Sequence, residues 1–213
     1  MTEVVPKIDT VILDFDGTIA DSASVSLETL AEVLHRPPFT SEQITDFHTL
    51  PTRTSMKNLG IKTWQLPYLL MQGRRITAKK MDQVEIFEGM PEAIRQLDEE
   101  DYRLYVLSTN SLKNITDLLD RNGLDGNITD IRAGAGMFNK AKRLAALMKK
   151  GSLIAEQCVY VGDEVRDIEA ARRVGMKCLA VEWGFHAPQA LTANHPDALV
   201  ATPTDLVGAV QSL

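Results

Sequence analysis

The sequence predicts an α/β fold, with a Rossmann-like parallel sheet core and a small all-α cap inserted after the first strand. Two observations predict this fold class. Apolar runs of strand length alternate with helical patterns from residue 88 to the end of the chain, which is typical of a parallel sheet with crossover helices. Between residues 22 and 88, helical patterns follow one another without a convincing strand. A chain of 213 residues is long enough for one sizeable core with a small appended unit.

The predicted strands are rich in Val, Ile and Leu and are apolar along nearly their whole length. Such runs are expected where helices cover both faces of a sheet, because both sets of side chains are then buried. The five runs are residues 10–15, 103–109, 128–134, 158–163 and 177–183. The crossovers between parallel strands should be right-handed.

The core helices are predicted from the spacing of their apolar residues and from the glycines that follow them. Glycine favours the left-handed backbone that ends many helices. The predicted helices are residues 91–100, a segment marked by Leu112, Ile115, Leu118 and Leu119, residues 140–150 and residues 167–174. Gly123, Gly151 and Gly175 follow the last three of them.

Four helices are predicted in the inserted segment. The first is marked by Val25, Leu30, Val33 and Leu34 and ends at residues 36–38, which read Arg-Pro-Pro. Thr40 and Gln43 have the spacing of a capping box at the start of the second. The third ends at Gly60, and the fourth covers residues 66–80. We therefore predict a core formed by residues 1–20 and 88–213 and a helical cap formed by residues 21–87.

Composition and charge argue against some partners and leave open a small anion bound in a local positive pocket. The net charge of -6 argues against nucleic acid or an anionic membrane as the partner. No apolar run is long enough to span a membrane, and the first ten residues contain no apolar signal segment. Cys158 and Cys178 are too few for a disulfide framework and are predicted to be buried free thiols. We expect a cytoplasmic protein.

Polar residues follow three of the predicted strands at the point where each strand ends. Because the carboxyl ends of parallel strands meet at one edge of the sheet, where ligands bind, these residues should converge. They are Asp14 and Asp16 after the first strand, Ser108, Thr109 and Asn110 after the second, and Gly162, Asp163 and Glu164 after the fourth.

The acidic residues of this group predict a metal site. Asp163 and Asp167 are four residues apart, so a helix that starts near Glu164 turns both carboxylates the same way. Together with Asp14 they would form a cluster in which each negative charge raises the proton affinity of the others. A hard divalent cation removes that cost, and Mg²⁺ binds through a few carboxylates while keeping positions for a phosphate.

Four motifs carry a family resemblance. They are "DFDGTIADS" at residues 14–22, "VLSTNS" at residues 106–111, "FNKAKRL" at residues 138–144 and "VYVGDEVRDIEAARRVGM" at residues 159–176. They resemble motifs I to IV of the haloacid dehalogenase-like phosphatases, and the tail from residue 180 resembles the phosphoglycolate phosphatase-like branch. The resemblance covers essentially the whole chain and is weakest over residues 36–85.

The resemblance implies a role for each motif residue. Asp14 is the nucleophile that becomes an aspartyl-phosphate, and Asp16 is the general acid and base. Thr109 hydrogen-bonds the phosphoryl oxygens, and Lys140 neutralises the charge of the nucleophile and the phosphate. The implied Mg²⁺ ligands are Asp14, the backbone carbonyl of Asp16, Asp163 and Asp167. Gly17, Thr18 and Asn110 are further candidate substrate-binding residues, since free amides near Gly17 can hold phosphate oxygens.

The physical chemistry agrees with these roles. Phosphoryl transfer needs positioning and charge neutralisation, and a carboxylate approaches a phosphate dianion only where cations intervene. General acid catalysis requires a carboxyl group with a raised pKa, and a neighbouring carboxylate raises it.

Each assignment has a simpler structural alternative. The two aspartates before Gly17 are also typical of a turn, and Thr109 also fits a helix cap, with Ser108 as the alternative phosphate ligand. Lys142, Lys149 and Lys150 lie near Lys140, and surface lysines are usually only solvated. Glu164 and Asp167 also suit the start of a helix, where negative charge is favourable.

Arg53 is the candidate substrate ligand in the cap, because a guanidinium binds a carboxylate through two hydrogen bonds. A solvated arginine at a helix end is the alternative. Trp64, Trp183 and Phe185 are predicted to be packing residues, with Trp183 and Phe185 near the pocket entrance. The histidines show no metal-ligand spacing and are predicted to lie on the surface or in loops: His35, His48, His186 and His195.

The predicted function is Mg²⁺-dependent hydrolysis of a small phosphorylated metabolite, with phosphoglycolate suggested by the resemblance. A sugar phosphomutase or a phosphonatase on the same scaffold is the alternative. A dehalogenase would have no use for Asp16 or a metal, and a non-catalytic phosphate-binding protein would not need the full set of motif residues. Either a monomer or a homodimer is compatible with the sequence.

Overall fold

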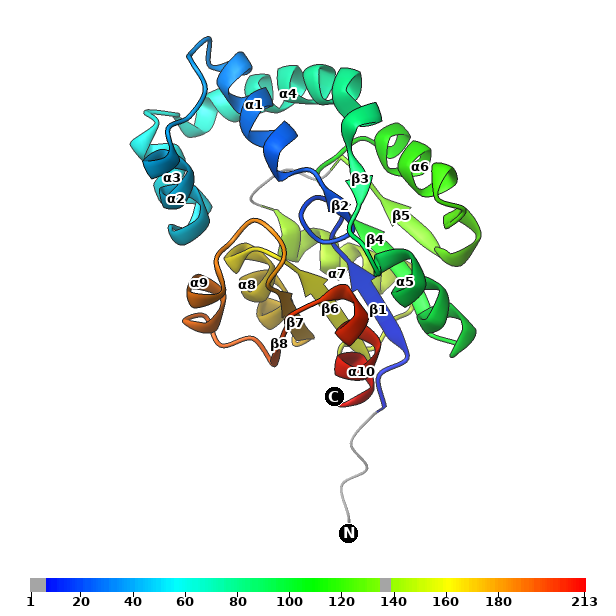
Figure 1. The fold of residues 1–213 in the computed structure, drawn as a ribbon. Coiled ribbons are helices and arrows are strands. Elements are labelled where there is room, and N and C mark those ends of the chain that lie inside the picture. The colour runs from blue at the N-terminus through cyan, green and yellow to red at the C-terminus, as the bar shows by residue number, and fades with distance from the viewer. Residues whose placement is uncertain (1–6, 135–138) are drawn as a thin grey trace.

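The computed structural model describes residues 7–134 and 139–213. Its centre is a six-stranded parallel sheet in the order β5-β4-β1-β6-β7-β8 (Figure 1). The strands are β1 (Thr10–Leu13), β4 (Arg103–Leu107), β5 (Asp130–Arg132), β6 (Cys158–Gly162), β7 (Lys177–Val181) and β8 (Ala198–Val200). The predicted α/β fold class is confirmed. The first six residues of the predicted core and Phe138 of the lysine motif lie outside the described residues.

Helices cover both faces of the sheet, which explains why its strands are apolar on both sides. One cluster of buried side chains joins Val11 and Leu13 of β1 to α5 (Met90–Glu99), α6 (Leu112–Arg121) and α10 (Leu206–Gln211). A second cluster joins Ile12 to α7 (Lys140–Gly151), α8 (Val165–Arg173) and α9 (Pro188–Thr192). Consecutive residues of β1 therefore belong to opposite halves of the core.

Strand β1 lies in the middle of the sheet, between β4 and β6. Leu13 pairs with Val106 on one side and with Val161 on the other. Beyond the last residue of the strand, the amide of Asp14 still donates to the carbonyl of Val161 at 2.8 Å. The end of β1 is thus fixed from the β6 side at the residue where the predicted site begins.

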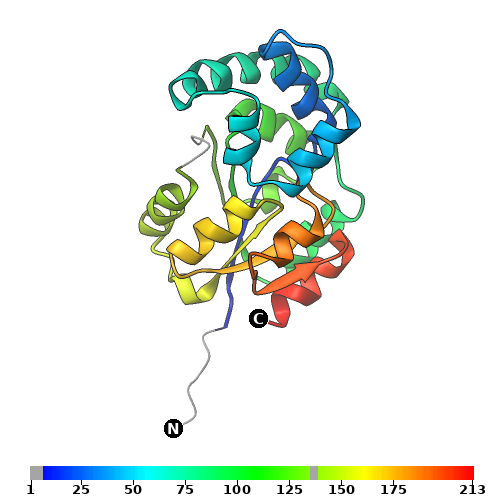
Figure 2. The same ribbon diagram turned by 90° about the vertical axis from the view of Figure 1, so that its left-hand side faces the viewer.

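Four α-helices lie above the carboxyl edge of the sheet and form the cap (Figures 1 and 2). They are α1 (Ala23–Val33), α2 (Ser41–Thr49), α3 (Thr52–Asn58) and α4 (Leu66–Lys80). The predicted capping box is present, because the Thr40 hydroxyl accepts from the Gln43 amide and the Gln43 side chain accepts from the Thr40 amide. Short 3₁₀ turns occupy Thr63–Gln65, Met81–Gln83, Asp125–Asn127, Ala155–Gln157 and Pro203–Asp205.

The chain enters and leaves the cap through two short antiparallel strands, β2 (Ala20–Asp21) and β3 (Glu85–Ile86). The prediction that residues 22–88 contain no strand is therefore wrong at β3. Two residues are too few for a hydrophobic period, so a strand of this length leaves no signal in the sequence. Strand β8 is not among the predicted strands, because its three residues are also too few to show a hydrophobic period.

The end of α7 also differs from the prediction. Gly151 is the last residue of the helix, and Ser152 takes the left-handed conformation with φ 50°. A Cβ at position 151 would lie 3.0 Å from Cγ of Leu153 and 3.4 Å from the hydroxyl of Tyr105. The glycine thus allows the close approach of neighbouring side chains, whereas Gly123 and Gly175 have the positive φ expected of them.

Both cysteines agree with their prediction. Cys158 and Cys178 are buried free thiols. In the part of the chain that the structure describes, no helix has both the length and the hydropathy needed to cross a membrane.

Candidate active site

Three carboxylates meet at the carboxyl edge of the sheet. Asp14 follows β1, Asp163 follows β6, and Asp167 lies in the first turn of α8. One oxygen of each lies within 4.8 Å of the others, and all three residues are buried. These are the acidic residues that the sequence predicted to converge.

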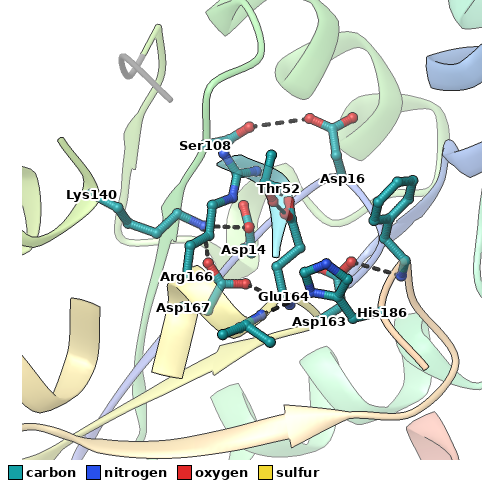
Figure 3. Close-up of polar contacts among 12 residues, drawn as sticks. Asp14, Asp16, Thr52, Ser108, Lys140, Asp163, Glu164, Arg166, Asp167 and His186 are labelled. Atoms are coloured by element: carbon teal, nitrogen blue, oxygen red, sulfur yellow. Dashed lines mark hydrogen bonds and ion pairs between the residues drawn. The ribbon is translucent and has the colours of Figure 1, made fainter. Parts of the chain in front are cut away.

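Lys140, the first residue of α7, lies among these acids (Figure 3). Its side chain is 4% exposed. Its Nζ donates to Oδ2 of Asp14 at 2.5 Å and also to Oδ1 of Asp167. Lys142, Lys149 and Lys150 are exposed, so the structure brings only the predicted lysine of this helix into the cluster.

Asp163 is held by donors from two loops. Oδ1 accepts from the hydroxyl of Thr18 at 2.9 Å, and Oδ2 accepts from the amide of Phe185 at 2.9 Å. The loops approach this closely because they carry glycines. A Cβ on Gly17, which has φ 78°, would lie 2.1 Å from Oδ2 of Asp163, and one on Gly184 would lie 2.1 Å from its Cβ.

Asp16 lies apart from the three clustered carboxylates. Its side chain accepts from the hydroxyl of Ser22 at 2.9 Å and from Nδ2 of Asn110 at 3.0 and 3.2 Å. A longer bond of 3.4 Å comes from the hydroxyl of Ser108. The Ser108 hydroxyl also accepts from the Asn110 amide, which leaves Thr109 as the better candidate to contact a ligand.

Burial changes the proton affinities of the cluster. It raises the pKa of Asp14 to about 6, although the charge of Lys140 acts in the opposite direction. Burial and the neighbouring acids raise the pKa of Asp163 well above its usual range. Burial opposes the charge of Lys140, but the carboxylates of Asp14 and Asp167 still raise its pKa well above the usual value. Burial is thus the largest cause of the raised pKa values of Asp14 and Asp163.

The cluster fits a hard divalent cation. All its donors are carboxylate oxygens, and they lie close together in a buried position, which is the ligand type that such a cation prefers. Asp14, Asp163 and Asp167 are the side chains that could hold such an ion.

A second group of contacts links the site to the cap, and the sequence gives no sign of it. Glu164 accepts from Arg166 and, at 2.9 Å, from the hydroxyl of Thr52 in α3 (Figure 3). The sequence suggests Glu164 only as a residue of the metal site or of the helix start, and it does not single out Arg166. A contact between positions 52 and 164 leaves no local sequence pattern.

His186 agrees with the prediction that the histidines lie on the surface or in loops, but its burial was not predicted. It follows β7 in a loop, but it is only 1% exposed. Its Nδ1 accepts from the amide of Val165 at 2.9 Å, and its Nε2 lies 3.1 Å from the carbonyl of Leu50 in the cap. Burial lowers its pKa. The neutral imidazole thus bridges the core and the cap, which is a role that spacing alone does not reveal.

A cavity of about 280 Å³ lies between the cap and the core. Its core side includes Asp16, Thr109 and Asn110 of the site. The cap contributes mainly apolar side chains: Leu27, Leu30, Val33, Phe47, Met56, Leu59, Ile61, Leu66, Leu69 and Leu70. A small molecule that binds here would contact the catalytic edge with one end and the cap with the other.

The structure does not bring Arg53 to this cavity. Among the described residues, the one cationic side chain that the cap contributes to the cavity lining is Arg74 of α4. It donates to the carbonyl of Thr109 at 3.1 Å, whereas Arg53 is exposed on α3. The two arginines lie on different cap helices, Arg53 on α3 and Arg74 on α4, and the sequence did not single out Arg74.

The fold and the site together define a hydrolase with a parallel α/β core, a helical cap and a carboxylate at the end of its central strand. The chain belongs to the haloacid dehalogenase-like hydrolases, whose family model matches residues 11–181. It resembles their phosphoglycolate phosphatase-like branch, as the motifs predicted.

Named relatives agree with this assignment. The chain is 36% identical over 210 residues to a phosphoglycolate phosphatase from Synechococcus elongatus, with 95% of this chain and 97% of the relative covered. It is 27% identical over 217 residues to the pyrophosphatase PpaX from Listeria welshimeri, with 96% and 97% covered.

Solved structures share the fold. A haloacid dehalogenase-like family hydrolase from Streptococcus pneumoniae superimposes with a TM-score of 0.78 at 22% identity, covering 96% of this chain and 99% of the other. A predicted phosphatase from Clostridium acetobutylicum gives a TM-score of 0.84 at 18% identity, with 97% and 100% covered.

Proposed function

We propose that this protein is a Mg²⁺-dependent phosphatase that hydrolyses a small phosphorylated metabolite through an aspartyl-phosphate on Asp14. The observation that carries the proposal is the buried contact of Asp14 with Lys140 beside Asp163 and Asp167. A carboxylate in such a position attacks phosphorus, whereas a purely structural role would not explain three buried acids around one lysine.

The first half of the reaction uses both aspartates of the first motif. An oxygen of Asp14 forms a bond to phosphorus, and the bond between phosphorus and the leaving oxygen breaks. Asp16 gives its proton to that oxygen. Burial raises the pKa of Asp16, which helps it to hold the proton. Lys140 keeps the nucleophile in place and offsets the negative charge.

The second half regenerates the enzyme. Asp16, now ionised, takes a proton from water, and the water oxygen forms a bond to phosphorus. The bond between phosphorus and the oxygen of Asp14 breaks, which frees the Asp14 carboxylate and inorganic phosphate. Thr109, Asn110 and the backbone around Gly17 and Thr18 would hold the phosphoryl oxygens during both steps. Asp14, Asp163, Asp167 and the backbone carbonyl of Asp16 would hold Mg²⁺, which supplies charge neutralisation when it is bound.

Phosphoglycolate is the single compound best supported by the motifs and by the name of the Synechococcus relative. Its carboxylate needs a cation near the phosphoryl site. Arg53 remains the sequence-based candidate, but Arg74 lies at the cavity and donates to Thr109 in the present arrangement. A cytoplasmic location and a monomeric or homodimeric state remain predictions.

The test of the proposed function is phosphate release across a panel of compounds with and without Mg²⁺. The panel contains phosphoglycolate, pyrophosphate, sugar phosphates, nucleoside monophosphates and an aryl phosphate. We expect release that requires Mg²⁺ and favours a small metabolite. Absence of release from every compound in the presence of Mg²⁺ would reject the proposal.

A glycine substitution tests the metal site separately. We expect Gly184→Ala to displace Asp163, because the added Cβ would lie 2.1 Å from Cβ of Asp163 and 2.5 Å from the carbonyl of Gly17. Mg²⁺ should raise the unfolding temperature of the wild type but change that of the variant far less, since only an ion that binds the folded state stabilises it.

The matched control is Gly208→Ala, where a new Cβ meets nothing within 4 Å. Mg²⁺ should raise the unfolding temperature of this variant as much as it raises that of the wild type. If Mg²⁺ raises the unfolding temperature of Gly184→Ala by the same amount, the metal site does not depend on the close approach of Gly184 to Asp163.

A further inference from the structure

Arg166 is a cationic side chain at the site to which neither the motifs nor the relatives assign a role. It is the second residue of α8, between Asp163 and Asp167, and its side chain is 22% exposed. It lines the same cavity as Asp16, Thr109 and Asn110. Its guanidinium projects toward the region of Asp14 and Ser108 in Figure 3.

The electrostatics agree with this position. Burial raises the pKa values of Asp14 and Asp16, and the charge of Arg166 acts against that increase at both residues. Arg166 and Asp16 line the same cavity, so a ligand that receives a proton from Asp16 would lie near the guanidinium.

A purely structural explanation of Arg166 is weak. A positive charge in the first turn of a helix is unfavourable, because the amino end of the helix already carries a partial positive charge. The ion pair with Glu164 and the nearby charges of Asp167 and Asp14 offset this cost, but the ion pair also removes the charge of Glu164 from water. An arginine at this place is easier to explain if an anion binds beside it.

Arg166 would add a second side-chain cation to the site, besides Lys140. Lys140 already donates to both Asp14 and Asp167, so its charge is shared between two carboxylates. A phosphoryl group brings further negative charge into the cavity. The planar fork of a guanidinium can bind a carboxylate through one edge and a phosphate through another.

Hydrogen bonds through Glu164 connect this guanidinium to the cap. Arg166 donates to Oε1 of Glu164, and Oε2 of Glu164 accepts from the hydroxyl of Thr52 at 2.9 Å (Figure 3). Thr52 is the first residue of α3 in the cap. The contacts Thr52–Glu164–Arg166 form a continuous path from the cap to the catalytic edge.

We infer that Arg166 binds the phosphoryl group of the substrate, and that Thr52 of the cap positions it through Glu164. The inference rests on the proposed function, because the phosphoryl group is that of the same substrate. Arg166 is a direct ligand in this assignment, whereas Glu164 and Thr52 are positioning residues.

The experiment measures binding of inorganic phosphate by calorimetry in the presence of Mg²⁺, and kcat and KM for the best compound of the panel. Arg166→Gln should weaken phosphate binding by about 10- to 100-fold, the range expected for a lost charge-assisted hydrogen bond. Arg166→Lys, which keeps the charge but not the fork, should lie between Arg166→Gln and the wild type. Arg173→Gln, an exposed arginine of the same helix, is the control and should bind phosphate normally.

A double variant guards against a folding defect. Arg166→Gln leaves Glu164 without this ion pair, so Glu164→Gln combined with Arg166→Gln removes both charges. If the inference is correct, the double variant unfolds near the wild-type temperature and still binds phosphate weakly. Wild-type phosphate affinity in either Arg166→Gln protein would overturn it.

The cap contact has its own test. Thr52→Val keeps the shape of the side chain and removes the hydroxyl, and should weaken phosphate binding by about 2- to 5-fold, as for a single neutral hydrogen bond. In the Arg166→Gln background the same substitution should have no further effect, because both act through one contact path. Thr54→Val, an exposed threonine of α3, is the control. Additive effects of Thr52→Val and Arg166→Gln would reject the positioning role.

The two proposals fail in different ways. If the wild type hydrolyses a compound of the panel, and Arg166→Gln has the same phosphate affinity and KM as the wild type, the assignment of Arg166 is wrong and the proposed function stands. Phosphate binding that depends on Arg166, in a wild type that hydrolyses no compound, overturns the proposed function and supports the assignment of Arg166.

Discussion

Asp14→Asn is expected to lower the rate of phosphate release by about 10⁴-fold or more, the scale seen when an enzyme loses its nucleophile. An amide has no ionised oxygen with which to attack phosphorus. The substitution is nearly isosteric, so the new amide oxygen can still accept from the Phe15 amide that donates to Oδ1 of Asp14 at 2.8 Å. The measurements are phosphate release and the intact mass of acid-quenched enzyme, which reveals a phosphorylated chain in the wild type only.

Asp21→Asn is the matched control, because Asp21 belongs to the same motif but is exposed in β2. It should retain activity, and the unfolding temperatures of both variants should stay within about 5 °C of the wild type. A phosphorylated chain or wild-type turnover in Asp14→Asn would assign the nucleophile to another residue.

Lys140→Met is expected to lower kcat by about 10²- to 10³-fold or more, as for the loss of one electrostatic contact to the transition state. Methionine fills the buried volume but gives Asp14 and Asp167 no donor. The pH dependence should also change. Asp14 must be ionised to attack, so the rate rises with pH through its pKa. Since the charge of Lys140 lowers that pKa, the rise should occur at higher pH in the variant.

Lys142→Met is the control for this substitution. Lys142 lies two residues further along α7 and is exposed, so its removal should alter neither kcat nor the pH profile. An unchanged kcat in Lys140→Met would show that its contact with Asp14 is structural only.

The sheet was predictable because its central strands are buried on both faces. Residues 10–13 and 158–162 are fully buried, so an uninterrupted apolar run was a sufficient signal. The strands β2 and β3 were not predictable, since each has two residues and is defined by its partner rather than by its own composition.

The catalytic edge was predictable for a related reason. A parallel sheet brings the ends of its strands together, and Asp14 and Asp163 stand directly after two neighbouring strands. The roles of Gly184 and His186 could not be predicted from the sequence. Gly184 lies close to Asp163 and His186 lies close to the carbonyl of Leu50, and contacts between residues so distant in the chain leave no local sequence pattern. A role for Arg53 in substrate binding stays a prediction: its residue type is suitable, and its side chain is exposed on α3.

The central position of β1 has a consequence for biosynthesis. The strand leaves the ribosome early, but its neighbours β4 and β6 begin only at Arg103 and Cys158. All the cap helices are translated before either neighbour exists. Until then the segment Thr10–Leu13 has neither of its partner strands, and pairings between segments so distant in the chain form slowly. The strand that ends directly before Asp14 is therefore made early and enclosed late.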